Sequence, residues 1–419
     1  MRDRQLGSAD LMNRSLHTGI VAPSGVDRVL TAVETTKPIA ASCRPVLVSL
    51  IRFLMIYLSV GYSPAQAQRV FVHPGAVHGK AELDFVKARI AAGEEPWTSQ
   101  FQEMRKLAVP GNHTTAPNTE NAQKEDGTRA CANALAWYYT GNETYAKNAI
   151  GILNIWGTTF KGYTPVDGQN LLQGGWIGAL LGPSAEIMRG YSGWDRADMA
   201  RVQTMFKNAF YPVLNKMSTW NGNVDLTQID AMMNIAVFCD DENEFQLGIQ
   251  RLKSRSRNYF YLISDGPLPD PTFWFNPTKL VNGLTQETCR DNGHHAQYGM
   301  ASAFHAAEVA WNQGVDVYGE NRERYTTAME LMAAQLHSGK MQGTCTNNTS
   351  TTDLYATWEV GYHHYHHRKQ MDLPHTKLLI KEKVRIKGQS DWNILVHPTK
   401  AYLASWIDRI FNSKNSMSR

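Results

Sequence analysis

The sequence predicts an all-α fold, an (α/α) toroid that is an incomplete barrel of antiparallel helix hairpins. Apolar residues recur at helical spacing along the chain, strict alternation of apolar and polar residues is rare, and loops rich in Gly, Asn and Pro separate the helical stretches. No exact sequence repeat accompanies the helices, which disfavours a regular solenoid. A two-domain helical protein is the alternative.

Residues 1–67 precede this fold and are typical of an export leader. Residues 45–61 are an apolar run that follows Arg44, and residues 63–67 (SPAQA) are a small-residue cleavage pattern. The run contains Arg52 and is shorter than the ~20 residues of a membrane span, which argues against an anchor. We expect cleavage near Ala67, a periplasmic or secreted protein without stable membrane insertion, and a single toroid domain at 68–419.

The first predicted helix hairpin comprises residues 127–139 and 143–156, separated by the polar turn 140–142. The later helices are predicted from the same apolar spacing. They are residues 176–189, 196–217, 227–238, 242–263, 294–311, 321–337 and 352–365. Towards the C-terminus, residues 378–402 alternate basic with β-branched side chains, which predicts a short hairpin with a solvated charged face.

The charge of the chain after the leader limits the partners that can be expected. The leader holds 7 of the 42 Lys and Arg and 4 of the 38 Asp and Glu, so 35 basic residues face 34 acidic ones in the remaining chain. A nearly neutral domain gives no reason to expect nucleic acid or an anionic membrane as partner.

Four cysteines remain after the leader, which allows one or two disulfides in an oxidising compartment, and no pair of them has the spacing of a zinc site.

The stretch 286–298 is the strongest candidate for chemistry. Asp291 or Asn292 can cap a helix on which His294 and Tyr298 stand at i and i+4, on one face and about 6 Å apart at Cβ. These two groups can move protons on opposite sides of one bond, and Arg290 can bind a carboxylate. The alternative is a capped helix start with a structurally satisfied histidine.

A second candidate is the segment 220–225, which opens the helix 226–238. Asn221 and Asn223 are amides near a helix N-terminus, where they can donate to a carboxylate. Turn formation and helix capping are the alternative explanation.

Aromatic and histidine-rich segments supply further candidates for binding. Gln173, Trp176 and Trp274 lie in segments whose amides and aromatic rings suit carbohydrate faces, although core packing also explains them. Residues 358–368 include His363, His364 and Tyr365. No third metal ligand of recognised spacing accompanies these histidines and HExxH is absent, so stacking on a sugar chain is favoured over a metal site.

Taken together, five segments resemble the alginate lyase domain of helical-toroid polysaccharide lyases, in the branch that contains alginate and glucuronan lyases. These segments are residues 132–156, 172–189, 220–241, 286–314 and 358–368. The resemblance implies β-elimination on a 1,4-linked polyuronate, either alginate, polymannuronate or glucuronan, to give unsaturated uronate ends. Where the best-known members carry Trp-Asn-Asn-His, this chain has Trp-Asn-Gly-Asn at 220–223, so the usual neutralising histidine is absent.

The resemblance also implies roles for the residues. Asn221, Asn223 and Arg290 would neutralise the substrate carboxylate, and His294 and Tyr298 would transfer the protons, with no metal or other cofactor. His295 and Trp220 join the residues above as substrate-binding candidates, and the expected partner is an acidic polysaccharide.

Two other functions remain open at this stage. A toroid glycoside hydrolase would need two carboxylates flanking the scissile bond, and no convincing pair is evident in the sequence. A noncatalytic glycan-binding protein would need only the aromatic residues.

Overall fold

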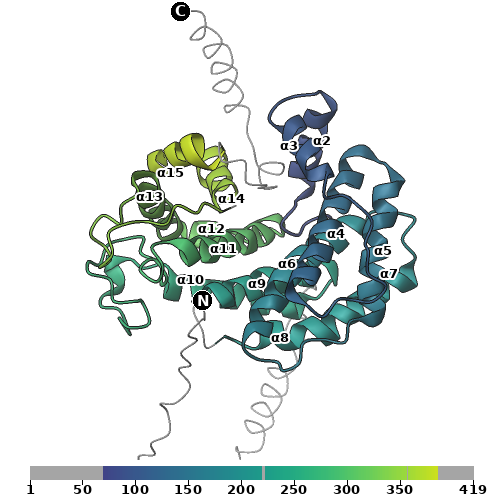
Figure 1. Ribbon diagram of the computed structural model, residues 1–419, viewed down its shortest axis with the longest axis horizontal. Helices are drawn as coiled ribbons and strands as arrows, with labels where there is room; N and C mark the ends of the chain where they lie inside the picture. Colours follow the sequence, from purple (N-terminus) through teal and green to yellow (C-terminus); the bar gives the residue numbers. More distant parts are fainter. Residues whose placement is uncertain (1–68, 219–221, 356, 386–419) are drawn as a thin grey trace, which may run out of the picture. The chain divides into compact units, whose positions relative to one another are not determined.

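The computed structural model describes residues 69–218, 222–355 and 357–385, all within the unit Gln68–Arg419 (Figure 1). The predicted leader and the predicted site residues Trp220 and Asn221 lie outside the described residues. The division into a leader and one toroid domain therefore stays a prediction.

The described residues form helices and three isolated β-bridges, with no extended strand among them. The α-helices are α2 (Lys80–Ala91), α3 (Trp97–Arg105), α4 (Glu120–Thr140), α5 (Glu143–Thr159), α6 (Gln169–Met188), α7 (Arg196–Met205), α8 (Tyr211–Asn215), α9 (Gly222–Phe238), α10 (Glu242–Tyr259), α11 (His294–Asn312), α12 (Val317–Glu320), α13 (Arg322–Ser338), α14 (Trp358–Tyr362) and α15 (Pro374–Leu379). Short helical turns of other types are η1 (Phe206–Phe210), η2 (Ile263–Asp265), η3 (His363–Arg368) and η4 (Ile380–Val384). The all-α prediction is confirmed.

Several predicted helices begin where they were expected, including α5, α10 and α11. The helix predicted for 352–365 is wrong at its start, since α14 begins only at Trp358. The residues before it contact the first turns of α11 and the residues just ahead of that helix. Thr351 N donates to Asn292 O at 2.9 Å, and the Thr357 hydroxyl donates to Gln297 O at 3.0 Å.

The hairpin predicted for 378–402 is also wrong where the chain is described. Residues 378–384 belong to α15 and η4, and residues 386–402 lie outside the described residues. Leu379, Ile380 and Val384 are all buried in one core cluster, which is a helical spacing and not the alternation of a strand. Burial of this apolar face therefore overrides the local charge pattern.

Glycines allow α6 and α9 to pack closely, and the contacts show that the two helices are parallel. A Cβ at Gly175 would lie 2.8 Å from Cγ2 of Thr227, and one at Gly178 would lie 2.8 Å from Cβ of Ala231. Both contacts advance towards the C-terminus along both helices. Larger side chains on this face of α6 would push the helices apart.

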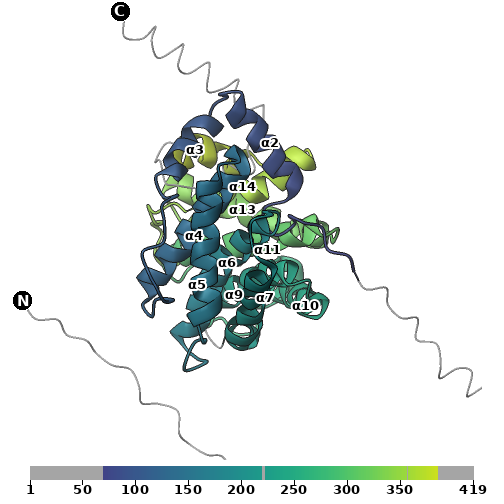
Figure 2. The same cartoon turned by 90° about the vertical axis from the view of Figure 1, so that its right-hand side faces the viewer.

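The helix α11 continues the parallel arrangement on the other side of α9. The hydroxyls of Thr227 and Ser302 are 3.1 Å apart, and further along both helices Asp230 Oδ2 lies 3.2 Å from His305 Nδ1. Figures 1 and 2 show α4, α6, α9 and α11 side by side in this order.

At the two ends of this row, α4 and α14 keep the same direction. In the first turns of α4 and α6, Gln173 Nε2 donates to Gln123 Oε1 at 2.6 Å. A Cβ at Gly361 of α14 would lie 3.0 Å from the ring of Phe304 in α11. The N-terminal ends of α4, α6, α9, α11 and α14 therefore lie on one face of the toroid, called here the N-terminal face.

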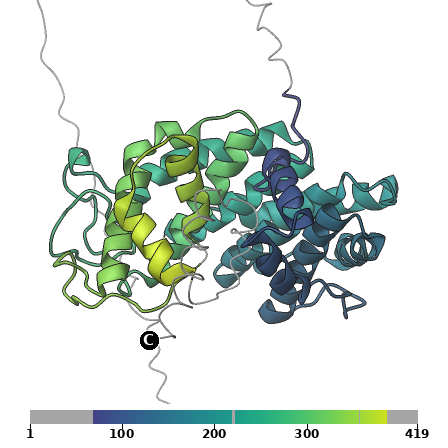
Figure 3. The same cartoon turned by 90° about the horizontal axis from the view of Figure 1, so that it is seen from above.

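Every residue of α9 is buried, so this helix is the centre of the fold. Its polar side chains are buried with the apolar ones and have partners inside the fold, as Asn234 has with Val77 N and Thr227 with Ser302, which is typical of a helix enclosed by others. One side packs into a core cluster with α4 to α8, and the other into a cluster with α10 to α15. The helices α5, α7, α10 and α13 cover the inner row, which gives the predicted (α/α) toroid (Figure 3).

The residues 69–79, called here the N-terminal arm, pack against the opposite ends of the inner helices. The arm places Gly75 N 3.0 Å from Glu186 Oε1, near the end of α6, and Val77 N 3.0 Å from Asn234 Oδ1 in α9. None of the helices in the described part of the chain is both long and apolar enough to span a membrane.

His73 gives the arm a pH-dependent contact. Burial alone would lower its pKa, but its hydrogen bonds to Glu186 (2.7 Å) and Asp240 (2.9 Å) outweigh burial and raise the pKa above 6.5. Protonated His73 therefore stabilises the fold fully below the unfolded pKa, and this contribution is lost as pH rises through the folded pKa.

We expect His73→Gln to lower the free energy of unfolding by about 1.5–3 kcal/mol at about pH 5.5, where the charged contact is present, and by less at about pH 9. Denaturant unfolding of both proteins at the two pH values measures the difference. An equal loss at both values would contradict the assignment of charge to His73.

Candidate active site

The predicted catalytic residues of the described chain gather on the N-terminal face. Asn223 lies in the first turn of α9, and His294, His295 and Tyr298 lie in the first two turns of α11. The N-terminal ends of parallel helices carry partial positive charge and free backbone N–H groups. This face therefore favours an anionic ligand.

The rings of His294 and Tyr298 meet as the i,i+4 spacing predicts. Their centroids are 5.5 Å apart in an edge-to-face arrangement. A third ring, Tyr355 from the segment before α14, packs against both, with centroid distances of 5.0 Å to His294 and 4.5 Å to Tyr298. All three side chains are partly exposed, so the cluster is open to a ligand.

His294 has two polar partners from the same segment. Its Nδ1 lies 3.1 Å from Asp353 Oδ2, and the Tyr355 hydroxyl lies 3.1 and 3.2 Å from the two ring nitrogens. Sequence analysis missed Asp353 and Tyr355 because it assigned residues 352–365 to a helix. The polar run 344–353 (TCTNNTSTTD) is the signal that could have indicated a loop there.

His295 is held by the residue four positions before it. Asp291 accepts a hydrogen bond from the His295 backbone N at 3.0 Å and contacts the His295 ring with its other oxygen. Burial raises the pKa of Asp291, but the bonds from His295 and the charge of Arg290 outweigh this and lower it. Asp291 therefore stays a carboxylate that accepts from a backbone N–H in the first turn of α11 and orients His295, whereas the N-cap position, predicted for Asp291 or Asn292, is occupied by Gly293.

Arg290 and Asn223 are brought together by a carboxylate that the sequence analysis did not assign to this site. Glu287 is fully buried and accepts from Arg290 Nη1 at 2.8 Å and from Asn223 Nδ2 at 2.5 Å. Its other oxygen accepts from the backbone N of Asn223 at 3.2 Å and the Tyr259 hydroxyl at 2.9 Å. This arrangement fixes the two predicted carboxylate-binding side chains relative to each other.

The closeness of α10 and α11 at this point depends on the glycine that follows Tyr298. A Cβ at Gly299 would lie 2.2 Å from the Tyr259 hydroxyl. Glycine therefore makes room for Tyr259 to reach Glu287 beneath the catalytic face of α11. Burial and the charge of Glu287 raise the pKa of Tyr259 well above its ordinary value, so its hydroxyl stays a donor.

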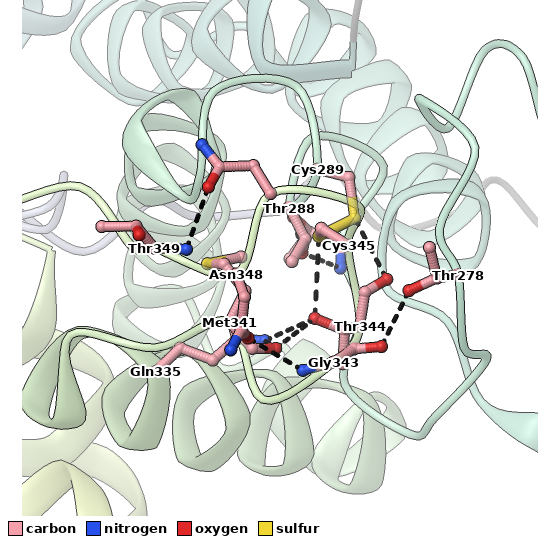
Figure 4. The surroundings of a disulfide bond; sticks show 12 residues. Thr278, Thr288, Cys289, Gln335, Met341, Gly343, Thr344, Cys345, Asn348 and Thr349 are labelled. Atoms are coloured by element: carbon pink, nitrogen blue, oxygen red, sulfur yellow. Dashed lines mark hydrogen bonds between the residues drawn. A yellow bond between two sulfur atoms is a disulfide. The ribbon is translucent and has the colours of Figure 1, made fainter.

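A disulfide joins Cys289, next to Arg290, to Cys345, 56 residues later (Figure 4). Around it, the backbone N of Thr278 donates to Thr344 O at 2.9 Å and the Thr278 hydroxyl donates to Gly343 O at 2.7 Å. The bridge fixes the start of the segment that carries Asp353 and Tyr355. Cys131 and Cys239 are buried free thiols.

We expect the Cys289→Ala, Cys345→Ala double variant to lose about 2–4 kcal/mol of unfolding free energy, the usual contribution of a disulfide. Its kcat should fall as well, because the segment bearing Tyr355 loses an anchor. Denaturant unfolding and turnover, each with and without dithiothreitol, measure both effects. The Cys131→Ala, Cys239→Ala double variant is the matched control, because it keeps the disulfide. Dithiothreitol should lower its stability and its kcat as much as it lowers those of the parent.

Gln173 and Trp176 lie on the same face, in α6. Gln173 is 7% exposed, and its amide nitrogen donates a hydrogen bond to Gln123. Trp176 is partly exposed, with Lys124 Nζ 3.7 Å from its ring centroid. The ring and the cation are accessible to a charged sugar, whereas the Gln173 amide is buried and donates to Gln123, so the binding roles of both residues stay predictions.

Trp274 lies apart from this cluster. It is 6% exposed and packs in a small core with Tyr261, Leu268 and Leu284. One edge lines a cavity of about 770 Å³ that also contains Arg257 and reaches Gln286. His294 and Tyr298 are not among the residues that line it.

The structure corrects two of the three predicted binding residues near the C-terminus. His364 is fully buried and stacks on Tyr318 at 3.9 Å, and burial lowers its pKa to about 3. Tyr365 is 1% exposed and donates to Tyr318 O at 2.9 Å. Both are core side chains, so neither is available to a substrate. His363 is partly exposed and stays a prediction.

Among residues 69–218, 222–355 and 357–385, no group of three or more His, Cys, Asp and Glu side chains is arranged to hold a metal ion. The histidine-rich segment of η3 is included in this range.

A family model described as alginate lyase matches residues 86–341. The matched region contains Asn223, Arg290, His294 and Tyr298, and it ends before Asp353 and Tyr355. Comparison with curated proteins yields no match.

Alginate lyases are among the solved structures that this chain resembles in fold. A complex of an alginate lyase A1-III variant with a tetrasaccharide has 15% identity and a TM-score of 0.57, over 81% of this chain and 99% of that chain. Alginate lyase A1-III from Sphingomonas species A1 has 15% identity and a TM-score of 0.56, over 81% and 100%. An alginate lyase from Bacteroides ovatus has 10% identity and a TM-score of 0.56, over 78% and 100%.

Proposed function

The chain belongs to the alginate lyase family and is therefore a polysaccharide lyase, and we propose that it cleaves a 1,4-linked polyuronate, alginate or glucuronan, by β-elimination. The observation that carries this proposal is the cluster of His294, Tyr298 and Arg290 at the positive ends of parallel helices. Such a face suits an acidic sugar whose neighbouring proton must be removed.

The first requirement of the reaction is to neutralise the uronate carboxylate, because the C5 proton is otherwise too weakly acidic. Arg290 uses one N–H at Glu287, and its side chain is 31% exposed, which leaves further N–H donors for the substrate. Asn223 is held beside it through Glu287, and the N-terminus of α9 adds backbone N–H groups. These donors stabilise the negative charge that develops on the carboxylate as C5 is deprotonated.

The second requirement is a base for the C5 proton and an acid for O4. The base breaks the C5–H bond, and the electron pair moves towards the carboxylate. The C4–O4 bond then breaks, the C4=C5 double bond forms, and O4 takes a proton. Tyr298 and His294 are the proposed groups, and Tyr298 can serve both steps when the proton and O4 lie on the same face of the sugar. For the opposite stereochemistry, His294 removes the C5 proton and Tyr298 donates its own proton to O4.

The experiment that tests the function is ultraviolet absorbance over time, with the segment 68–419 on polymannuronate, polyguluronate and glucuronan. Elimination creates a conjugated double bond that absorbs, whereas hydrolysis does not. Rising absorbance on one polymer identifies both the reaction and the substrate. New reducing ends without absorbance would instead indicate a hydrolase, and no new ends on any polymer would favour a glycan-binding protein.

We also propose that the protein is exported, with residues 1–67 as the cleaved leader. The disulfide between Cys289 and Cys345 supports this proposal, because such bonds persist in oxidising compartments. N-terminal sequencing of the protein recovered outside the cytoplasm should begin at or near Gln68. A chain that keeps residues 1–67 in the cytoplasm would contradict it.

A further inference from the structure

Asp353, Tyr355 and Thr357 are fastened to α11 by Gln297, which lies between the two proposed catalytic residues in the sequence. Gln297 is fully buried, and its Nε2 donates to Asp353 O at 3.1 Å while its Oε1 accepts from Tyr355 N at 3.3 Å. Its backbone O accepts from the Thr357 hydroxyl. The segment is therefore positioned by α11 itself, immediately before the buried start of α14.

This attachment places the Tyr355 hydroxyl against His294 and the Tyr355 ring against Tyr298. The hydroxyl lies 3.1 and 3.2 Å from the ring nitrogens of His294, and the Tyr355 ring is tilted by 37° against that of Tyr298. A phenol in this position touches both proposed proton-transferring groups at once.

Tyr355 is suited to donate a hydrogen bond. Partial burial, its hydrogen bond to Tyr298 and the charge of Asp353 all raise the pKa of Tyr355, so its hydroxyl stays a donor. Asp353 competes for the same hydrogen, but its side chain is 56% exposed and water can satisfy it. His294, His295 and Asp291 are the other titratable groups around this pair.

We propose that Tyr355 is a positioning residue for the lyase reaction: its hydroxyl orients Tyr298 and His294 and donates to the Tyr298 oxygen when that oxygen is the anionic base. The inference rests on the proposed function. It concerns a residue beyond position 341, where the family match ends. The proton taken from C5 goes to Tyr298, and Tyr355 keeps its own proton throughout.

The test is Tyr355→Phe, which keeps the ring that packs against His294 and Tyr298. We expect kcat to fall by roughly 10- to 100-fold with KM little changed, because a hydrogen bond to a charged oxygen is lost. The rise of kcat with pH should also move to higher pH by about one unit, since the anionic base is less stabilised. Tyr145→Phe, which removes an outer-helix hydroxyl 3.3 Å from Arg105 Nε, is the matched control with unchanged kinetics.

The outcomes separate this inference from the proposed function. A parent protein that produces no absorbance on any polyuronate would remove the function itself. An active parent with a Tyr355→Phe variant of unchanged kcat and pH profile, or with a raised KM only, would overturn the role of Tyr355 alone. If Tyr355→Phe does not fold, 3-fluorotyrosine at position 355 keeps the ring and provides a stronger donor. It should then move the pH profile to lower pH, and an unmoved profile would overturn the proposal.

Discussion

Replacing Tyr298 by phenylalanine is expected to lower kcat by about 10²- to 10⁴-fold, the usual contribution of a positioned general acid or base. The phenol hydroxyl is the only group of this side chain that can exchange a proton. The ring contacts with His294 at 5.5 Å and Tyr355 at 4.5 Å survive the substitution. The variant should therefore fold normally and still bind the polymer.

Turnover of the polymer identified by ultraviolet absorbance measures the effect, and the melting temperature shows whether the fold is kept. His294→Ala should also lower kcat, whereas Tyr145→Phe should not. A Tyr298→Phe variant with the kcat of the parent would remove Tyr298 from the mechanism. If neither Tyr298→Phe nor His294→Ala altered any property of the protein, a noncatalytic glycan-binding role would explain the site better.

The helices could be predicted from sequence because their signal is local. Apolar residues at helical spacing define α5 and α11, and the i,i+4 pair of His294 and Tyr298 follows from helix geometry alone. Residues 196–217, predicted as one helix, are helical to Asn215 with a turn of another type inside. Where local charge and tertiary burial disagreed, at residues 378–384, burial decided the structure.

The site could be predicted only in part, because its remaining contacts join distant segments. Glu287 and Asn223 are 64 positions apart, and Tyr355 is 61 positions from His294. Nothing in the local pattern distinguishes a carboxylate that organises a site from one that faces water. The same limit applies to His364, whose neighbours in sequence are aromatic and histidine residues but whose partner in space is Tyr318.

Glu287→Ala is expected to lower the free energy of unfolding by about 3–5 kcal/mol, because it leaves buried donors without an acceptor. The Tyr259 hydroxyl, the Asn223 amide and the Asn223 backbone N all lose their partner. Arg290 is partly exposed, so water can replace its contact. Glu287→Gln keeps the volume and one acceptor oxygen, and its loss should be smaller.

The catalytic effect of Glu287 can be separated from its effect on stability by a matched variant at another buried carboxylate, Glu308 in α11. Glu308 is also fully buried, with Arg368 at 2.7 Å and the Tyr318 hydroxyl at 3.2 Å, but it lies towards the other end of α11. Denaturant unfolding should show a comparable loss for Glu308→Ala. Measured per folded molecule, kcat/KM should fall only for Glu287→Ala, because only that variant releases Arg290 and Asn223 from each other. Equal kcat/KM in the two variants would mean that Glu287 stabilises the fold without organising the site.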